Sequence, residues 1–569
     1  MIAKPSINEQ RKRLYYDEGY WTSDTILDIW NNRVETRGNA EYVVDDQGAR
    51  LTYAEVDAHA ERLAGWLAGI GVRPRDAVSF QIPVWSEFAV VMVACLKVGA
   101  VMHPLSMRFN AADVVSALEM VQSSAFICAK TFHCHDFEKQ ILSVMDDLAH
   151  LRGAAVIEHG TRATGKIAVY EHLLANSVLL DPASAHVGID SDDVALILST
   201  SGTTGNQKAV LLTHNNLLYS ERQFVKELEL TQDDIMFMPA PLNHATGFNH
   251  GLISPLILGG KVILQQDFCV PAAIELMNRE HVTWSMGATP FIYDILRCAD
   301  AGGPHPNTLR FYLCGGAPVP GTMVHQAREQ GIVLCEVYGS TESCPHVYVP
   351  PAYALGWNGK FSGRPFCGIE VRVVDKQGND VAPGVQGEEL SRGPNVFVGY
   401  LNNEEATRAT LDDEGWFHSG DLCSMDERGR IRINGRKKEI IIRGGENVSA
   451  REVDEAAMGC PGIEDAATIG MPDPRLGERI CLYAVATDPR RPTSLEDLLE
   501  FLHRRGVAKR LWPERLEYIE AIPRTESGKV KRNQLSDDLA IRLVAAEKTS
   551  HTNSLVNALK PQKAKGVGA

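Results

Sequence analysis

Apolar runs of strand length alternate with amphipathic, helix-like stretches from about residue 54 to about residue 385. Residues 77–82 form one such run, residues 87–98 have a helical pattern, and residues 101–105 form the next run. Strands that alternate with helices pair mainly in parallel and form layered sheets. The pattern therefore predicts a large α/β domain whose ligands bind at the carboxyl ends of its strands.

The pattern changes after about residue 368, where short β-rich segments with turn dipeptides replace the alternation. The charged run at residues 436–439 ends this texture, and helices then mix with strands as in a compact α+β domain. The chain is therefore predicted to have an N-terminal domain at 1–435, a connection at 436–438, a small C-terminal domain at 439–545 and a solvated tail at 546–569.

Composition narrows the class of protein. The chain has 569 residues, 44% of them hydrophobic and 23% charged, with a formal net charge of −15. An acidic surface repels nucleic acid, so an anionic substrate needs a local positive site. The first 13 residues lack an apolar signal-peptide core, and the longest apolar run, 88–96, lies between Glu87 and Lys97. We expect a cytoplasmic enzyme that binds no nucleic acid and has no transmembrane segment.

A loop rich in glycine and hydroxyl side chains follows the apolar run at 194–198. Glycines allow backbone N–H groups to turn inward, and hydroxyls and a lysine add donors and charge, which suits a polyphosphate. The P-loop pattern does not match, because Ala209 follows the lysine. The predicted nucleotide-binding residues here are Thr200, Ser201, Gly202, Thr203, Thr204, Gly205 and Lys208.

Four further segments carry candidate chemistry, although each alone is also explained by turn formation. Residues 337–343 offer an aromatic face, hydroxyls and a carboxylate, which could stack on a purine, contact a phosphate and hold Mg²⁺. An aspartate in residues 415–422 could accept both ribose hydroxyls. The other two segments are the basic run at 435–447 and the turn at 523–529, which ends in a lysine.

In this order the five segments resemble those of the adenylate-forming superfamily, over about residues 51–538. Within it, stretches such as 241–248, 287–291 and 391–397 look like a bacterial short- to medium-chain acyl-CoA synthetase. The resemblance implies a large N-terminal domain of layered sheets and a small mobile α+β domain. It also implies that the acid reacts with ATP to give acyl-AMP and pyrophosphate, after which the acyl group passes to coenzyme A.

The resemblance also implies residue roles. Tyr338 would stack on adenine beside Gly316 and Ala317, Gly315 and Gly339 would also belong to the cofactor site, and Thr341 would contact the α-phosphate. Glu342, with Thr204, would hold Mg²⁺. Asp421 would bind the ribose, Arg436 would lie between ribose and phosphate, and Lys529 would bridge the carboxylate and the α-phosphate. Lys438 would be the hinge, moving Gly444 and Gly445 toward the thiol. The catalytic candidates are Lys529, Thr341, Glu342, His244 and Arg436.

Two departures from the superfamily's pattern stand in the first loop, where Gln207 replaces the usual proline and Ala209 the usual glycine. Small and apolar residues predict an acyl pocket lined by His244, Thr246, Gly247, Phe248, Gly287, Ala288, Gly315 and Gly339, with Gly339 facing the channel. A carrier-protein phosphopantetheine as acceptor, an aryl acid as substrate and a catalytically silent nucleotide-binding protein stay open as alternatives. A homodimer also stays open.

Overall fold

The computed structural model describes residues 1–158, 167–181, 188–201, 207–316, 319–443, 446–473, 475–525 and 528–543. The chain divides into two compact units. The first comprises Met1–Ser419 and Cys423–Ile433, and the second comprises Gly420–Leu422 and the chain from Asn434 onward. Each unit has its own buried cluster of apolar side chains.

The largest sheet of the first unit has a parallel centre and antiparallel edges. Its strands stand in the order β18 (Arg364–Pro365), β17 (Ser343–Tyr348), β16 (Val333–Ser340), β15 (Phe311–Gly315), β14 (Trp284–Ala288), β12 (Ile235–Met238), β13 (Lys261–Leu264), β1 (Glu41–Asp45) and β2 (Arg50–Thr52). The carboxyl ends of β14, β15 and β16 lie at one edge, as neighbouring parallel strands require.

A second sheet is parallel apart from one hairpin at its edge. Its order is β11 (Gln207–Thr213), β10 (Val194–Ser201), β4 (Val101–Pro104), β3 (Ala77–Gln81), β5 (Ala125–Ala129), β8 (Gly153–Ile157) and β9 (Ala168–Val169). The short strands β6 (Thr131–Phe132) and β7 (His135–Asp136) form a separate hairpin. Strand β10 ends where the predicted phosphate loop begins.

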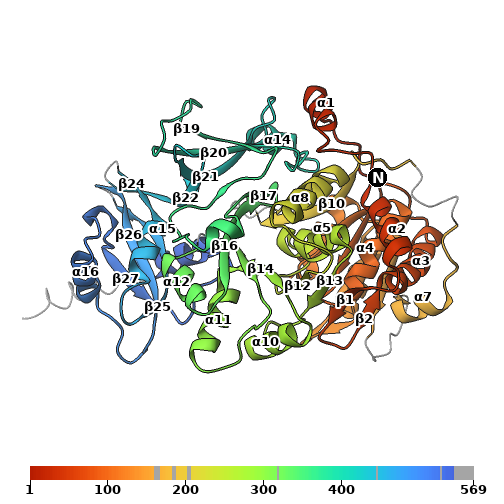
Figure 1. Cartoon of the computed structure of the whole chain (residues 1–569), viewed down its shortest axis with the longest axis horizontal. Helices are drawn as coiled ribbons and strands as arrows, with labels where there is room; N and C mark the ends of the chain where they lie inside the picture. Colours follow the sequence, from red (N-terminus) through yellow and green to blue (C-terminus); the bar gives the residue numbers. More distant parts are fainter. Residues whose placement is uncertain are drawn as a thin grey trace, which may run out of the picture. The chain divides into compact units, whose positions relative to one another are not determined.

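Helices pack on these sheets and between them. Figure 1 shows α2 (Ile26–Arg37), α3 (Tyr53–Gly69) and α4 (Glu87–Val98) packed together. Helix α4 is buried from Phe88 to Val98, as expected of a helix that is apolar all round. The others are α1 (Glu9–Asp17), α5 (Ala111–Val121), α6 (Phe137–Leu142), α7 (Tyr170–Asn176), α8 (His214–Glu227), the π-helix η3 (Thr246–Ile253), α9 (Ser254–Leu258), α10 (Val270–Arg279), α11 (Thr289–Asp300), α12 (Gly321–Glu329), α13 (Pro351–Ala354) and α14 (Glu404–Thr410), with the short 3-10 helix η1 (Met145–Asp147).

The β-rich texture after residue 368 corresponds to a sheet of β19 (Glu370–Val374), β20 (Gln386–Arg392), β21 (Phe417–Met425) and β22 (Ile431–Arg436), in which β19 and β20 are antiparallel. The second unit has a sheet ordered β24 (Glu446–Ser449), β23 (Ile440–Arg443), β26 (Gly477–Ala486) and β25 (Ile463–Asp473), with β27 (Arg515–Tyr518) parallel to β26. Helices α15 (Ala450–Ala457) and α16 (Leu495–Arg504) and the 3-10 helices η4 (Lys437–Glu439) and η5 (Lys509–Leu511) also belong to it, and residues 532–543 are helical. The predicted α/β class with a smaller α+β unit is confirmed.

Four charged side chains form a network of ion pairs at the β2 edge of the largest sheet, which connects β2 with β1, β13 and the end of α10. Glu280 accepts hydrogen bonds from Arg50 at 2.8 and 3.0 Å and from Lys261 at 3.2 Å. Arg50 and Lys261 also bind Glu41. The Arg50 hydrogen bonds lower the pKa of the Glu280 carboxyl to about 2.

Replacing Glu280 with glutamine is expected to lower the free energy of unfolding at pH 7 by about 1–2 kcal/mol. The effect is no larger because Arg50 is half-exposed and solvent screens the ion pair. A carboxyl whose pKa falls on folding stabilises the native state above its ordinary pKa of 4.5, and this stabilisation is lost as the pH falls toward 2. Melting temperatures of the variant and the wild type should therefore converge as the pH falls from about 4.5 toward 2. A difference in melting temperature that does not change with pH would contradict this role. So would an equal loss of stability in Glu404→Gln, which removes one member of the exposed Arg408–Glu404 pair.

Candidate active site

The predicted phosphate loop connects an antiparallel hairpin. Strands β10 and β11 pair Ser199 with Ala209, Thr200 with Lys208 and Ser201 with Gln207. Gly202, Thr203, Thr204 and Gly205 lie outside the described residues, as do the side chains of Thr200 and Ser201. The methyl group of Ala209 is buried in an apolar cluster with Ile197. The alanine that stands at the superfamily's usual glycine position therefore packs its methyl group into the buried face of the hairpin.

Lys208 leads to a residue that the sequence did not indicate. Its ammonium lies 4.6 Å from the centroid of the Tyr400 ring, within the range of a cation–π contact. The Tyr400 hydroxyl in turn donates a hydrogen bond of 2.8 Å to Oε1 of Glu342. Burial, followed by the charge of Glu342, raises the pKa of the Tyr400 hydroxyl, so it remains a donor at neutral pH. Tyr400 thus links the lysine of one motif to the carboxylate of another.

The second motif lies on the hairpin of β16 and β17. Tyr338 is on β16, and Thr341 and Glu342 form the turn between the strands. The carbonyl oxygen of Glu342 accepts a bond of 2.8 Å from the N–H of Phe397. The hydroxyl of Ser340 is buried without a hydrogen-bond partner among the described residues. A hairpin tip held in this way brings the Glu342 carboxylate and the Thr341 hydroxyl together on one turn.

The glycines around this motif differ in where a side chain would point. Gly315 ends β15, and a Cβ there would contact Met286 at 3.6 Å. Gly316 has a φ of +85°, which favours glycine, and Ala317 lies outside the described residues. A Cβ at Gly339 would meet the carbonyl oxygen of Ser343 at 2.8 Å. The prediction that Gly339 faces the acyl channel is therefore wrong, because its side-chain direction is filled by the backbone of its own hairpin.

The side-chain position of Gly287 is also filled by its neighbours. A Cβ at Gly287 would lie 2.6 Å from the hydroxyl of Tyr312 and 2.9 Å from Phe291. Ala288 lies on the opposite face of β14, because successive side chains of a strand alternate. Ala288 pairs with Gly315, so these two share one face. Sequence spacing alone could not separate the two faces.

The segment from His244 to Phe248 leads into the π-helix Thr246–Ile253, a rare form that is frequent at functional sites. His244 Nδ1 accepts a bond of 3.3 Å from the N–H of Thr246. Phe248 is fully buried. A Cβ at Gly247 would lie 2.1 Å from the carbonyl oxygen of Pro241, so only glycine fits this close contact.

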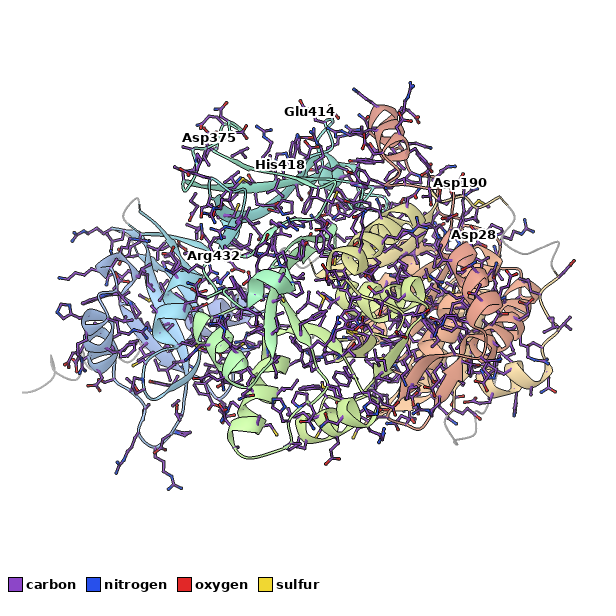
Figure 2. The ribbon with its side chains drawn as sticks, viewed as in Figure 1. Asp28, Asp190, Asp375, Glu414, His418 and Arg432 are labelled. Carbon is purple, nitrogen blue, oxygen red and sulfur yellow. The ribbon has the colours of Figure 1, made fainter. Side chains whose placement is uncertain are left out.

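Asp421 and Arg436 are neighbours in the second unit. Asp421 is on β21 and Arg436 ends β22, and Arg436 Nε lies 2.9 Å from Asp421 Oδ1. Figure 2 shows His418 and Arg432 on the same two strands. Asp421 is 5% exposed. The geometry joins the predicted ribose carboxylate, which is buried, to the predicted phosphate-side arginine, whose side chain is 42% exposed, in one ion pair.

The predicted hinge residues 436–438 run from the end of β22 into the 3-10 helix Lys437–Glu439. The side chain of Lys438 and all of Gly444 and Gly445 lie outside the described residues. The predicted tail at 546–569 lies outside them too. The division of the chain between Ile433 and Asn434 is close to the predicted boundary.

Lys529 stands on a turn closed by several hydrogen bonds within the second unit. Its N–H donates to Oγ1 of Thr525 at 3.1 Å, and its carbonyl oxygen accepts from the N–H of Thr525 at 2.8 Å. Gly528 has a φ of +80°, which favours glycine. Arg524 binds both oxygens of Asp465 at 2.8 Å. The backbone below the lysine is therefore fixed by its own unit.

Glu342 fits a role in holding Mg²⁺. Mg²⁺ is commonly bound by one or two carboxylates together with phosphate oxygens of a substrate, rather than by a cage of protein ligands. Among the residues that the structure describes, no group of three or more His, Cys, Asp or Glu side chains could hold a metal. A single oriented carboxylate, connected through Tyr400 to Lys208, agrees with that mode of binding.

Comparison with known proteins adds independent evidence. The family described as AMP-binding enzyme matches residues 30–401, and its C-terminal domain family matches residues 452–529. The medium-chain fatty-acid–CoA ligase of Escherichia coli (strain K12) is 40% identical over 538 residues, which cover 95% of this chain and 94% of the relative.

Two solved structures share the fold. ATP-bound MatB from Rhodopseudomonas palustris has a TM-score of 0.81 at 25% identity, covering 91% of this chain and 99% of that one. O-succinylbenzoate coenzyme A synthetase from Bacillus subtilis, in complex with ATP and magnesium ion, has a TM-score of 0.78 at 25% identity, covering 90% and 100%. The chain therefore belongs to the AMP-binding enzyme family and is an AMP-forming acid–thiol ligase that uses ATP and coenzyme A.

Proposed function

We propose that this acyl-CoA synthetase acts on short- to medium-chain fatty acids. The observation that carries the proposal is the face of β14 and β15 that holds Met286, Ala288 and Gly315, which offers only apolar or small groups. Trp284, on the same face, packs against Phe224 of α8, so this face is turned toward the helical layer. The name of the E. coli relative supports the same class of acid.

In the first half-reaction, a carboxylate oxygen attacks the α-phosphorus of ATP, and pyrophosphate leaves. Like charges repel, so this step needs donors and cations around the phosphates. We assign the phosphate contacts to Lys208, Thr341 and the loop from Thr200 to Gly205, and the bridging of carboxylate and phosphate to Lys529. Tyr338 stacks on the adenine beside Gly316, and the Asp421–Arg436 pair binds ribose and phosphate.

Mg²⁺, held by Glu342 with Thr204, would neutralise charge on the phosphate oxygens. Tyr400 orients Glu342 through its 2.8 Å hydrogen bond. Because the same ring contacts Lys208, one aromatic side chain supports both charged groups at the phosphates. This arrangement supports a metal-assisted adenylation at the β16–β17 hairpin.

In the second half-reaction, the thiol of coenzyme A attacks the activated carbonyl, and AMP leaves. The two steps need different groups beside the same carbonyl. We propose that Lys438 is the hinge about which the second unit rotates, withdrawing Lys529 and bringing Gly444 and Gly445 to the thiol.

The acceptor and the acid can be tested in one assay. The release of AMP is measured over straight-chain, branched and aromatic acids, with and without coenzyme A. Turnover with hexanoate to decanoate that requires free coenzyme A supports the proposal. Turnover that requires a phosphopantetheinylated carrier protein would favour the loading enzyme instead, and turnover with aromatic acids alone would exclude the fatty-acid assignment. In the described ranges no helix is long and apolar enough to cross a membrane; a cytoplasmic location and a homodimer stay predictions.

Ala288→Leu is expected to shorten the preferred acid by several carbons and leave the KM for ATP unchanged. The added side chain would extend on the face shared with Gly315. Each methylene that loses its site forfeits about 0.8 kcal/mol, or roughly fourfold in affinity. The measurement is kcat/KM for each even-numbered acid from butyrate to laurate.

The matched control is Ser285→Ala, on the same strand but on the opposite face, where the hydroxyl binds the carbonyl oxygen of Phe237 at 2.8 Å. It should keep the wild-type chain-length profile. An unchanged profile in Ala288→Leu would remove Ala288 from the acyl site.

A further inference from the structure

A fully buried pair of titratable side chains connects the β16–β17 hairpin to β20. His346 on β17 and Glu389 on β20 are both 0% exposed, and His346 Nε2 lies 3.2 Å from Glu389 Oε1. Breaking a buried ion pair is costly, and an apolar pair of similar volume is often as stable or more so. Such a pair therefore calls for a reason beyond packing.

The hydrogen-bond partners of His346 show what the pair contains. Its Nδ1 lies 2.8 Å from the carbonyl oxygen of Ser343, which can only accept. Nδ1 must therefore carry a proton, and the contact between Nε2 and Glu389 needs a second one. The pair is an imidazolium with a carboxylate, or a neutral imidazole with a carboxylic acid. Either form carries no net charge and has a fixed ring orientation.

Tyr338 is in contact with both members of this pair. Its hydroxyl donates to Glu389 Oε2 at 3.4 Å. The edge-to-face contact of its ring with His346 has a centroid separation of 4.7 Å and an interplanar angle of 68°. The phenol is thus held both at its hydroxyl and along its ring.

The backbone of the hairpin is held by other contacts. The Ser343 hydroxyl accepts from Nδ2 of Asn395 at 3.1 Å and lies 3.4 Å from the hydroxyl of Ser391. The same Asn395 amide binds the carbonyl oxygen of Pro345 at 3.3 Å, and Phe397 binds Glu342. Because these contacts hold the hairpin backbone independently of Glu389, its two carboxylate oxygens serve the side chains of His346 and Tyr338.

We propose that His346 and Glu389 are positioning residues that hold the Tyr338 ring in the orientation in which it receives the adenine of ATP. The inference rests on the proposed stacking role of Tyr338. A ring that is ordered before the nucleotide arrives does not have to be immobilised on binding, which lowers the entropic cost. Loss of the pair should weaken ATP binding by roughly 3–10-fold, the cost of ordering one side chain.

The test compares His346→Leu, Glu389→Leu and the double variant. Each single variant leaves one buried polar partner without its pair, so both should melt at lower temperature. The double variant removes both groups and should regain most of the melting temperature. If the pair positions Tyr338, the double variant still has a KM for ATP raised 3–10-fold, with the KM values for acid and coenzyme A unchanged. A double variant with a wild-type KM for ATP overturns the proposal.

Tyr338→Phe gives an independent measurement that does not depend on the folding of the double variant. It keeps the ring and removes the hydroxyl that contacts Glu389, so it should raise the KM for ATP by part of the same factor. Added to the double variant, it should have no further effect. A wild-type KM for ATP in Tyr338→Phe, or fully additive effects in the triple variant, would contradict the proposal.

Two controls separate the possible failures. Lys97→Leu breaks another shielded ion pair, formed with Asp57 and Glu61 at 2.8 Å, and should lower the melting temperature without changing the KM for ATP. Tyr338→Ala tests the stacking role itself. If Tyr338→Ala leaves ATP binding intact, the proposed site is wrong; if it weakens binding and the double variant does not, only the positioning role fails.

Discussion

Lys529→Ala is expected to slow acyl-adenylate formation by about 10²–10³-fold, the usual loss when a preorganised electrostatic group is removed from a reacting centre. The lysine is the proposed bridge between the attacking carboxylate and the α-phosphate, and the turn beneath it stays closed in the variant, since its bonds involve backbone atoms and Thr525. The rate is measured by acid-dependent exchange of labelled pyrophosphate into ATP.

The second half-reaction provides the contrast. Thioester formation from synthetic acyl-adenylate and coenzyme A should survive in Lys529→Ala, because no phosphorus is attacked in that step. Lys531→Ala, two residues along the same segment, should keep both half-reactions. Equal losses in the two half-reactions would mean that the substitution damages the second unit as a whole.

Lys438→Pro is expected to stop thioester formation by at least about 10²-fold while acyl-adenylate accumulates. Proline fixes φ near −65° and removes a backbone donor, so it should block a rotation about this residue. Rapid-quench measurements of acyl-adenylate and acyl-CoA over one turnover distinguish a blocked rotation from a slow first step.

A proline placed where the backbone tolerates it is the matched control. Glu427 lies in the turn between β21 and β22, which a 3.0 Å bond from the N–H of Gly429 to the carbonyl oxygen of Asp426 closes. Proline is favoured at the second position of such a turn, so Glu427→Pro should keep both half-reactions. Normal overall turnover in Lys438→Pro would place the hinge elsewhere.

The layered α/β fold could be predicted from the sequence because it depends on local periodicity. Strand-length apolar runs such as residues 77–82 and 101–105 became β3 and β4. The motifs around Tyr338 and Asp421 also carry their information locally, since their residue types and order are distinctive. For such features, neighbouring residues in the chain are also neighbours in space.

The supporting residues could not be found in this way. Tyr400 contacts Glu342 across 58 positions, and Glu389 contacts His346 across 43. Neither Tyr400 nor Glu389 stands in an unusual local pattern. For a related reason the sequence could not show which way Gly287 and Gly339 face. A glycine has no side chain whose hydrophobicity indicates which face of a strand is buried.

The closed turn at residues 524–530 determines how a rotation of the second unit could act. Since Lys529 is fixed by Thr525 and the turn is tied to Asp465, the lysine has no need to refold when its unit changes orientation. The unit would move as a rigid body and carry the Lys529 ammonium to or from the reacting carboxylate. The orientation of the unit would then decide which half-reaction can occur. A substitution that loosens this turn but keeps Lys529 would then let the lysine move independently of its unit, so the two steps would no longer be strictly separated.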